Sequence, residues 1–318
     1  MTDSAIHVEN LHRTFDRIKA VDGITFAIPH GQVVGFVGAN GAGKTTTMRI
    51  LATLDYPTSG RAFVQGINVV LYPRKVRSLL GWVPDSFGTY ENMTVLEYLD
   101  FFARALNYRG AERVRRIQDV VEFTDLSPLC DRMVNKLSKG QGQRLCLGRA
   151  LIHDPQVLIM DEPAAGLDPK ARVELKRLIR LLAEEGKTIL ISSHILSELG
   201  EMCDSLLFVD KGKIVHFGTA EALKRGAEEF TFFDVQLAGG PEKLLDWALV
   251  SPHVKIAEER KAGARILIDS TDPEIIAGVL RRMVQDGLPV LEFHREERNL
   301  EDAFIDMLGR IERGQGLP

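Results

Sequence analysis

The segment Gly38–Thr45, with the sequence GANGAGKT, constrains the fold of this chain more than any other. It matches the pattern G-x-x-x-x-G-K-[ST] and directly follows the apolar run Val33–Val37. Glycines in this pattern let the backbone curl with its N–H groups facing inward, and the helix that follows adds partial positive charge at its N-terminus. We therefore predict a strand, a loop and a helix that hold a nucleoside triphosphate. The alternative is a glycine-rich turn without a ligand.

Two side chains of this loop have chemical tasks in such a cradle. The Lys44 ammonium can reach a β- or γ-phosphate, and the Thr45 hydroxyl can ligate Mg²⁺. The other loop positions expected to contact the nucleotide are Gly38, Asn40, Gly41, Ala42, Gly43 and Thr46.

Length and composition fit a globular protein of two domains. The chain has 318 residues, of which 45% are hydrophobic and 26% charged, and its formal net charge is −4. Because the basic residues are scattered, we expect no nucleic-acid partner. Cys130, Cys146 and Cys203 show no metal-binding or redox spacing, which predicts reduced thiols in a reducing compartment. No apolar run approaches about 18 residues, so we expect neither a signal peptide nor a membrane span.

The segments around the loop predict a mixed sheet. Residues 4–37 read as two strands of alternating hydrophobicity, typical of a half-exposed antiparallel sheet, and then the buried strand before the loop. Phe15 is expected at the first loop, either as a minor core aromatic or as a platform for a purine ring. A helix is expected from about Gly43 to Thr53, and one further strand over 60–69.

A helical insertion is predicted over about residues 91–150. Thr94 and Glu97 have the spacing of a capping box, ahead of apolar residues at helical intervals. The arginines between 113 and 116 are expected to form a solvated helix face rather than a binding patch.

Two further helix termini are marked by capping residues. In Leu137–Gln141, with the sequence LSKGQ, Ser138 fits an N-cap whose helix terminus is receptive to anions, although these five residues alone predict only a capped helix. Asp168 and Pro169 fit the N-cap and first position of a later helix, which Gly186 is expected to end.

An apolar run at 157–160 ends in two carboxylates, Asp161 and Glu162. Two acids at the end of a buried strand are poor for stability, because a desolvated charge is costly unless a cation or hydrogen bonds compensate for it. A functional role is the better interpretation. We expect Asp161 to hold Mg²⁺ and Glu162 to polarise an attacking water.

His194 follows another predicted strand, over 188–192. A lone histidine is usually structural. Here Gly38, Asp161 and His194 each follow a separate buried strand, and in open α/β sheets ligands bind at the carboxyl ends of the strands. Their convergence at one edge predicts that all three belong to one site.

After about Arg225 the pattern changes to short strands and helices without an acid–base or phosphate-binding constellation. It predicts a small α+β domain at 226–318 that ends in a helix over 300–308. The remaining domain spans 1–225.

In order and approximate spacing, the motifs resemble those of ABC-type ATPases over about residues 4–220. The motifs are Phe15, GANGAGKTT, LSKGQ, VLIMDE, AGLD and His194, and LSKGQ separates this family from other phosphate-loop proteins. The resemblance implies an α/β phosphate-loop NTPase domain with an antiparallel β subdomain and a helical insertion. It also implies an ATPase with ATP and Mg²⁺ as cofactors.

The resemblance assigns roles within one site. Phe15 would stack on adenine, Glu162 would act as the general base, and Lys44 and His194 would contact phosphate.

It also implies a second ATPase subunit, with a homodimer expected. Ser138, Gly140 and Gln141 would contact the γ-phosphate bound to the opposite subunit, and Asp168 would lie at the interface. One chain offers one phosphate cradle and one spare anion-receptive helix end, and two head-to-tail copies would use both in a closed arrangement.

The sequence departs from the family at two positions. Lys139 replaces the first glycine of the signature pair and is expected to point away from the nucleotide or to add positive charge. Asp85 stands where the family usually has glutamine. A carboxylate only accepts hydrogen bonds and adds negative charge near the γ-phosphate. We therefore expect Asp85 to face Mg²⁺, directly or through water.

The C-terminal segment LEDAFIDML, after an α+β extension, resembles ATPase subunits of ABC-2 type exporters. That resemblance implies a subunit on the cytoplasmic face of the cell membrane that powers a separate integral-membrane permease. The permease would contact residues 98–106 and the loop around Asp85, although 98–106 could equally pack its aromatics within its own subdomain. Two alternatives stay open: a soluble ABC-type ATPase acting on a ribosome or DNA complex, and a regulatory ATP-binding module with a vestigial ATPase.

Overall fold

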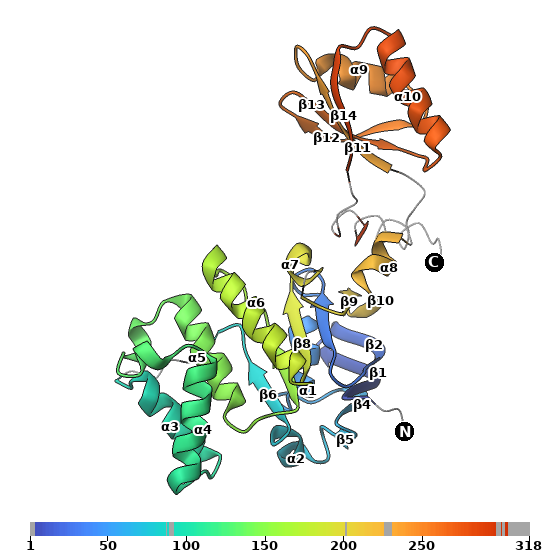
Figure 1. Ribbon diagram of the computed structural model, residues 1–318. Coiled ribbons are helices and arrows are strands. Elements are labelled where there is room, and N and C mark those ends of the chain that lie inside the picture. The colour runs from blue at the N-terminus through green and yellow to red at the C-terminus, as the bar shows by residue number, and fades with distance from the viewer. Residues whose placement is uncertain are drawn as a thin grey trace. The chain divides into compact units, whose positions relative to one another are not determined.

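The computed structural model (Figure 1) forms two compact units, Met1–Thr219 and Ala220–Pro318. Each unit has a hydrophobic core of its own. The structure describes residues 4–86, 88, 92–200, 202–225, 231–296, 300 and 303–304.

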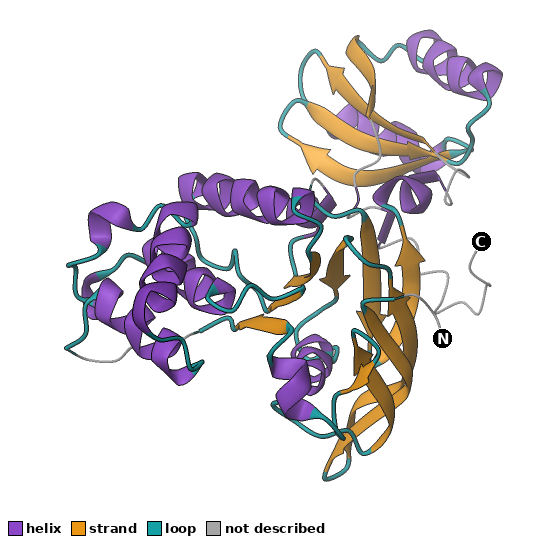
Figure 2. Cartoon of the chain, turned by 60° about the horizontal axis from the view of Figure 1, so that its bottom comes forward, coloured by secondary structure: helices purple, strands orange, loops and turns teal. Residues whose placement is uncertain are grey.

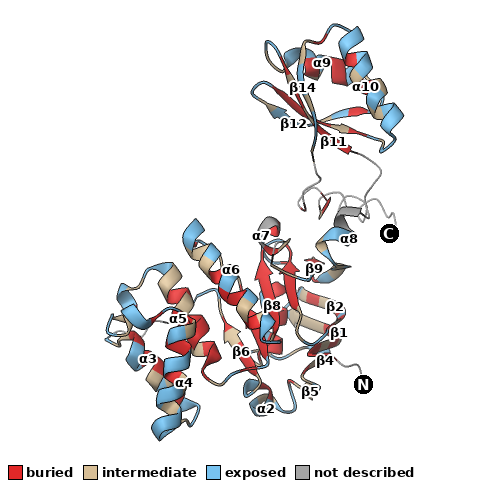
Figure 3. Cartoon of the chain, in the orientation of Figure 1, coloured by how far each residue is buried: buried red, intermediate tan, exposed pale blue. Residues whose placement is uncertain are grey.

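The first unit is built around a six-stranded sheet. Its order is β10 (Lys213–Gly218), β9 (Ser205–Asp210), β3 (Val33–Val37), β8 (Thr188–Ser193), β7 (Val157–Met160) and β6 (Leu80–Val83). All are parallel except β10, which pairs antiparallel with β9. Strands β3, β7 and β8 are buried along their whole length (Figure 3). Burial on both faces explains the unbroken apolar sequences of β3 and β7.

The position of β3 in this sheet creates a binding edge. β3 lies between β8 and β9, whereas the next strand of this sheet along the chain, β6, lies at the far edge. The order of strands therefore reverses at β3, and ligands of open α/β sheets bind outside the carboxyl ends of the strands at such a point. The phosphate loop and helix α1 (Lys44–Leu51) follow β3 at this edge.

A second sheet is antiparallel, as predicted. Its order is β2 (Ile18–Ile28), β1 (Ile6–Phe15), β4 (Ser59–Val64) and β5 (Ile67–Asn68). Its buried side chains share one core cluster with α1, β3 and β7. The single strand predicted over 60–69 is instead two strands, because Gln65 and Gly66 both have positive φ, 50° and 71°, and make a tight turn. Phe15 is the last residue of β1, directly before the first turn.

Helices α3 (Val95–Ala105), α4 (Gly110–Phe123) and α5 (Lys139–Leu151) form the helical insertion, which Figure 2 shows apart from the strands. The predicted capping box starts α3: the Thr94 hydroxyl accepts from the Glu97 amide at 3.2 Å, and the Thr94 amide donates to Glu97 at 2.8 Å. Arg113 is not merely solvated, because its guanidinium lies 2.8 Å from Asp100 and ties α4 to α3.

Helix α3 has an inner face with packed aromatic side chains and an outer face with exposed apolar side chains. Tyr98 is fully buried, with its ring centroid 4.8 Å from that of Phe102, and its hydroxyl accepts a hydrogen bond from Arg149 at 3.2 Å. Phe101 and Leu106 are exposed. The inner residues therefore pack within the subdomain, while the outer face is accessible.

The remaining helical elements complete the first unit. They are α2 (Pro73–Arg77), two 3₁₀ turns (Ser127–Leu129 and Val134–Lys136), α6 (Pro169–Glu184) and α7 (Leu196–Gly200). The predicted cap of α6 is present, since Asp168 accepts from the Ala171 amide at 2.9 Å and Pro169 takes the first position. Gly186 follows α6 with φ 80°, as expected of a residue that ends a helix.

The second unit is an α+β domain with a four-stranded antiparallel sheet. After α8 (Ala220–Arg225), its sheet order is β12 (Val254–Arg260), β13 (Gly263–Ile268), β11 (Thr231–Leu237) and β14 (Val290–Glu296). Along β11 and β13, every second side chain points into one hydrophobic core. Helices α9 (Glu242–Val250) and α10 (Pro273–Gln285) contribute their buried side chains to the same core. The helix predicted over 300–308 lies mostly outside the described residues. None of the helices within the described residues has the length and hydrophobicity needed to cross a bilayer.

Candidate nucleotide site

The phosphate loop depends on glycine at two points where backbone segments meet. A Cβ on Gly43, which has φ 105°, would lie 2.3 Å from the carbonyl oxygen of Ala20. A Cβ on Gly38 would lie 2.4 Å from the carbonyl oxygen of Val209. Only glycine fits at both positions. Gly43 caps α1 without a side-chain hydrogen bond, which leaves the helix N-terminus available to an anion.

A cavity of about 600 Å³ opens over this loop. Its volume lies in the range of small-molecule sites. Of the predicted residues, Phe15, Asn40–Thr46, Asp85, Asp161 and Glu162 line it. The structure therefore brings together residues that lie on separate strands and loops of the first unit.

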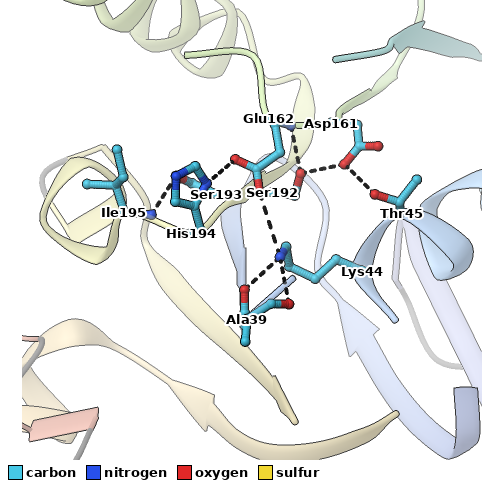
Figure 4. A network of polar contacts seen from close by, with 10 residues as sticks. Ala39, Lys44, Thr45, Asp161, Glu162, Ser192, Ser193, His194 and Ile195 are labelled. Atoms are coloured by element: carbon cyan, nitrogen blue, oxygen red, sulfur yellow. Dashed lines mark hydrogen bonds and ion pairs between the residues drawn. The ribbon is translucent and has the colours of Figure 1, made fainter. Parts of the chain in front are cut away.

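Lys44 is buried beneath this cavity, and Figure 4 shows its surroundings. Its ammonium donates to the carbonyl of Gly38 at 2.6 Å and to that of Ala39 at 3.3 Å, and lies 3.7 Å from a carboxylate oxygen of Glu162. Gly38 does not line the cavity; its carbonyl holds the lysine instead. The positive charge is thus fixed where the phosphate loop meets the acidic pair.

Asp161, directly after β7, contacts both β8 and the start of α1. One of its oxygens, Oδ1, accepts hydrogen bonds from the Thr45 hydroxyl at 3.1 Å and from the Ser192 hydroxyl at 2.7 Å. The side chain is only 4% exposed. Mg²⁺ is usually held by one or two carboxylates together with water and substrate phosphate oxygens. The Thr45 hydroxyl and the Asp161 carboxylate therefore fit this ion with nucleotide present.

Glu162 has an unusual backbone and a defined side chain. Its φ is 47°, a left-handed conformation that is uncommon for a residue with a side chain. Its amide donates to the Ser192 hydroxyl at 2.7 Å, and its Oε2 lies 2.9 Å from Nδ1 of His194. The His194 ring is half exposed. The histidine thus reaches the site by contact with Glu162.

Asp85 projects from the loop after β6. It is exposed, lines the cavity, and makes no hydrogen bond or ion pair with another described residue. Its carboxylate is therefore accessible to water or a cation.

The residues expected to act on a second subunit lie elsewhere in the first unit. Ser138 caps α5 by a capping box with Gln141: the Ser138 hydroxyl accepts from the Gln141 amide at 3.3 Å, and the Ser138 amide donates to Gln141 at 3.0 Å. Ser138, Gly140, Gln141 and Asp168 are all absent from the cavity lining. One chain does not bring them to its own phosphate loop.

The Lys139 side chain lies beside Gly166, a neighbour that the sequence did not predict. A Cβ on Gly166, which has φ 66°, would lie 2.6 Å from the Lys139 ammonium nitrogen. The lysine therefore lies against the loop that leads to Asp168.

Sequence reasoning missed several residues of the site, three of which have polar or aromatic side chains that matter for its chemistry. Arg49 and Trp82 line the cavity, and Ser192 lies behind the two acids. The signal for Ser192 was present, because two serines interrupt the end of the otherwise apolar strand that precedes His194.

A phosphate loop after the central parallel strand, with a hydroxyl and a carboxylate placed for Mg²⁺ and a second acid beside a histidine, defines a phosphate-loop ATPase. The LSKGQ sequence at the capped start of α5 adds the feature of the ABC type.

Comparison with known proteins agrees with this class. Residues 21–165 match the family described as ABC transporter, and residues 133–200 also match one described as an AAA domain, putative AbiEii toxin of a type IV toxin–antitoxin system. Together with a Nod factor export ATP-binding protein that is 33% identical over 94% of its length, this match shows that the chain belongs to the ATP-binding subunits of ABC transporters. The predicted fold class and family are thereby confirmed.

Two relatives show the extent of the similarity. A probable multidrug ABC transporter ATP-binding protein of Escherichia coli (strain K12) is 35% identical over 311 residues, which are 97% of this chain and 53% of that protein. The chain thus spans about half the length of that relative. A Nod factor export ATP-binding protein I of Ralstonia nicotianae is 33% identical over 307 residues, which are 96% of this chain and 94% of that protein.

Solved structures resemble about two thirds of the chain. A dimeric ATP-binding cassette in a post-hydrolysis state, bound to ADP and phosphate, has a TM-score of 0.62 and 25% identity, and the match covers 67% of this chain and 98% of that chain. A part of the ABC transporter complex cbiONQ from Clostridium perfringens has a TM-score of 0.63 and 29% identity, covering 68% and 89%.

Proposed function

We propose that this chain is the ATP-hydrolysing subunit of an ABC exporter. The observation that carries the proposal is the polar network of Lys44, Thr45, Asp161 and Glu162 at one cavity. The two relatives compared above are named for multidrug transport and Nod factor export, which favours export over a ribosome or DNA target.

Within the site, each side chain has a task that its geometry permits. Lys44 and the N-terminus of α1 bind phosphate oxygens, and Phe15 offers its partly exposed ring to the purine. Thr45 and Asp161 would hold Mg²⁺, which when bound would neutralise charge on the phosphates.

Two further residues act on the attacking water. Glu162 lies at the edge of the cavity, where its carboxylate orients the water and accepts its proton. His194 holds Glu162 in place through their 2.9 Å contact. By the family resemblance it would also contact the γ-phosphate. Asp85, which lines the same cavity, would face the metal directly or through water.

The active form is a homodimer. The capped helix end at Ser138, Gly140 and Gln141 completes the γ-phosphate site of the opposite subunit, and Asp168 lies at that interface. The dimeric cassette with ADP and phosphate supports this arrangement, because 98% of its chain is matched by 67% of this one. ATP binding closes the dimer, and hydrolysis with phosphate release opens it.

A separate integral-membrane permease converts this motion into transport, so the subunit lies on the cytoplasmic face of the membrane. Its contact surface is formed by the exposed Phe101 of α3, by Leu106 directly after that helix, and by the loop around Asp85. The ATPase domain spans 1–225, and an accessory domain of unassigned role spans 226–318.

One experiment tests the partner and the activity together. The tagged chain is purified from detergent-solubilised membranes, the bound membrane protein is identified, and ATP hydrolysis is measured. Recovery of a permease together with Mg²⁺-dependent hydrolysis is the expected result. Hydrolysis with no membrane protein bound, and with ribosomal proteins or DNA recovered instead, would overturn the export function.

A further inference from the structure

Ser192 lies at the carboxyl end of β8, behind the two acids of the site (Figure 4). It is fully buried and makes two hydrogen bonds of 2.7 Å. The Glu162 amide can only donate, so the serine oxygen accepts there. The Asp161 carboxylate can only accept, so the serine proton is directed to Asp161. The chemistry of the partners therefore fixes the direction of both bonds.

From this geometry we propose that Ser192 is a positioning residue that sets Asp161 and Glu162 relative to each other. Its hydroxyl is the single atom that joins the side chain of the metal-holding aspartate to the backbone of the water-orienting glutamate. The inference rests on the proposed function, because it assigns those two roles to the acids.

The left-handed backbone of Glu162 gives the contact its importance. A residue with a side chain persists at φ 47° only where surrounding contacts hold it there. The Ser192 hydroxyl supplies such a contact at the Glu162 amide. The same hydroxyl fixes Oδ1 of Asp161, on which Thr45 is the other donor. Loss of the hydroxyl thus removes one of the two donors to Oδ1 and leaves a partly buried amide without its partner.

Ser193 provides a matched control on the same strand. Ser193 is also buried. In Figure 4 its hydroxyl accepts one hydrogen bond, from the Ile195 amide at 3.0 Å. Replacing either serine by alanine removes one buried hydroxyl, but only Ser192→Ala removes a contact with the acids.

The experiment compares Ser192→Ala, Ser192→Thr and Ser193→Ala in the full chain. Binding of a fluorescent ATP analogue is titrated with Mg²⁺ and repeated in EDTA, and kcat and KM for ATP are measured. We expect Ser192→Ala to raise the Mg²⁺ concentration for half-maximal binding, and to lower kcat, by about 10- to 100-fold. Binding in EDTA and KM stay within about twofold of wild type. Ser192→Thr restores the wild-type values, and Ser193→Ala leaves them unchanged.

Hydrogen exchange of the nucleotide-free protein separates positioning from misfolding. Ser192→Ala should speed exchange of the Glu162 amide while amides of β3 and β7 keep their protection. An unchanged Mg²⁺ requirement with unchanged exchange at Glu162, or equal losses in both alanine variants, overturns the inference. If wild type fails to hydrolyse ATP, the proposed function fails, while Mg²⁺-dependent binding and amide exchange still test Ser192.

Discussion

Nδ1 of His194 lies 2.9 Å from Oε2 of Glu162, while the other carboxylate oxygen lies 3.7 Å from the Lys44 ammonium. The glutamate is thus held from two sides, by a residue after β8 and by one at the start of α1. Both contacts use the side chain that would take a proton from water, so each predicts a separate effect on hydrolysis.

Replacing Glu162 by glutamine should uncouple hydrolysis from binding. The amide keeps the size of the side chain but does not accept a proton, so we expect kcat to fall by a factor of about 10² to 10⁴ while ATP still binds. ATP should then trap the protein as a dimer, measured by size-exclusion chromatography with Mg²⁺. The exposed Glu184 at the end of α6 supplies a control, Glu184→Gln, that should behave as wild type. A Glu162→Gln monomer that still hydrolyses ATP would falsify the scheme.

Lys44→Ala should act earlier, at binding. The variant loses the buried ammonium that lies under the cavity, and with it the charge that meets the phosphates. We expect the affinity for ATP to fall by at least about tenfold, read as loss of the ATP-induced rise in melting temperature. Lys75→Ala, at an exposed position of α2, should keep that rise. Tight ATP binding by Lys44→Ala would assign the phosphate contact to other groups.

Phe15→Ala tests the two interpretations of this aromatic residue. The ring is 41% exposed, lines the cavity, and lies under the Arg13 guanidinium at 4.2 Å, so a core role is disfavoured. Loss of stacking worth about 1–2 kcal/mol should raise KM for ATP by roughly tenfold, without a matching fall in stability. Ile18 faces Phe15 in the strand register and is more exposed, which makes Ile18→Ala the control. An unchanged KM would indicate that Phe15 has a structural role instead.

Asp85→Gln restores the residue that the family usually has at this position. If the exposed carboxylate faces the metal, its removal should shift the Mg²⁺ dependence of ATP hydrolysis by several-fold. The measurement is a Mg²⁺ titration at saturating ATP, with the exposed Asp119→Asn of α4 as the control. Superimposable titrations of Asp85→Gln and wild type would exclude a metal role.

How far the site was predictable depends on how local its chemistry is. The phosphate loop is contiguous in the sequence, so its glycines, Lys44 and Thr45 can be recognised from the motif alone. Asp161 and Glu162 stood out because charge at the end of a buried strand needs a reason. The bond from Ser192 to Asp161 joins positions 31 residues apart, and the two meet only because β8 pairs with β7. The order of strands in a sheet cannot be predicted from the pattern of a single sequence.

The fold shows the same division. The strands and helices followed from hydrophobic periodicity and capping residues, such as Thr94 with Glu97. The turn at Gln65 and Gly66 was overlooked because the residues on either side are apolar enough to read as one strand, although a glycine there is a turn signal.

His153, at the end of α5, predicts a pH dependence of stability. Burial lowers the pKa of the His153 imidazole below its usual value of 6.5, so the ring is neutral in the folded state, where its Nε2–H donates to the Leu80 carbonyl at 3.1 Å. As the pH falls below 6.5 the unfolded chain takes up a proton before the folded one, so the contribution of His153 to stability is present above pH 6.5 and declines below it.

His153→Gln should therefore flatten part of this decline. The glutamine amide can still donate to the Leu80 carbonyl but does not titrate, so the variant should lose less unfolding free energy than wild type between about pH 7.5 and 5.5. Urea unfolding at a series of pH values measures the difference. Gln118→Asn, at an exposed position of α4 that does not titrate, serves as the control and should follow the wild-type curve. If His153→Gln and wild type decline in parallel, the fall in stability comes from other groups, among them His216, whose pKa is also lowered by burial.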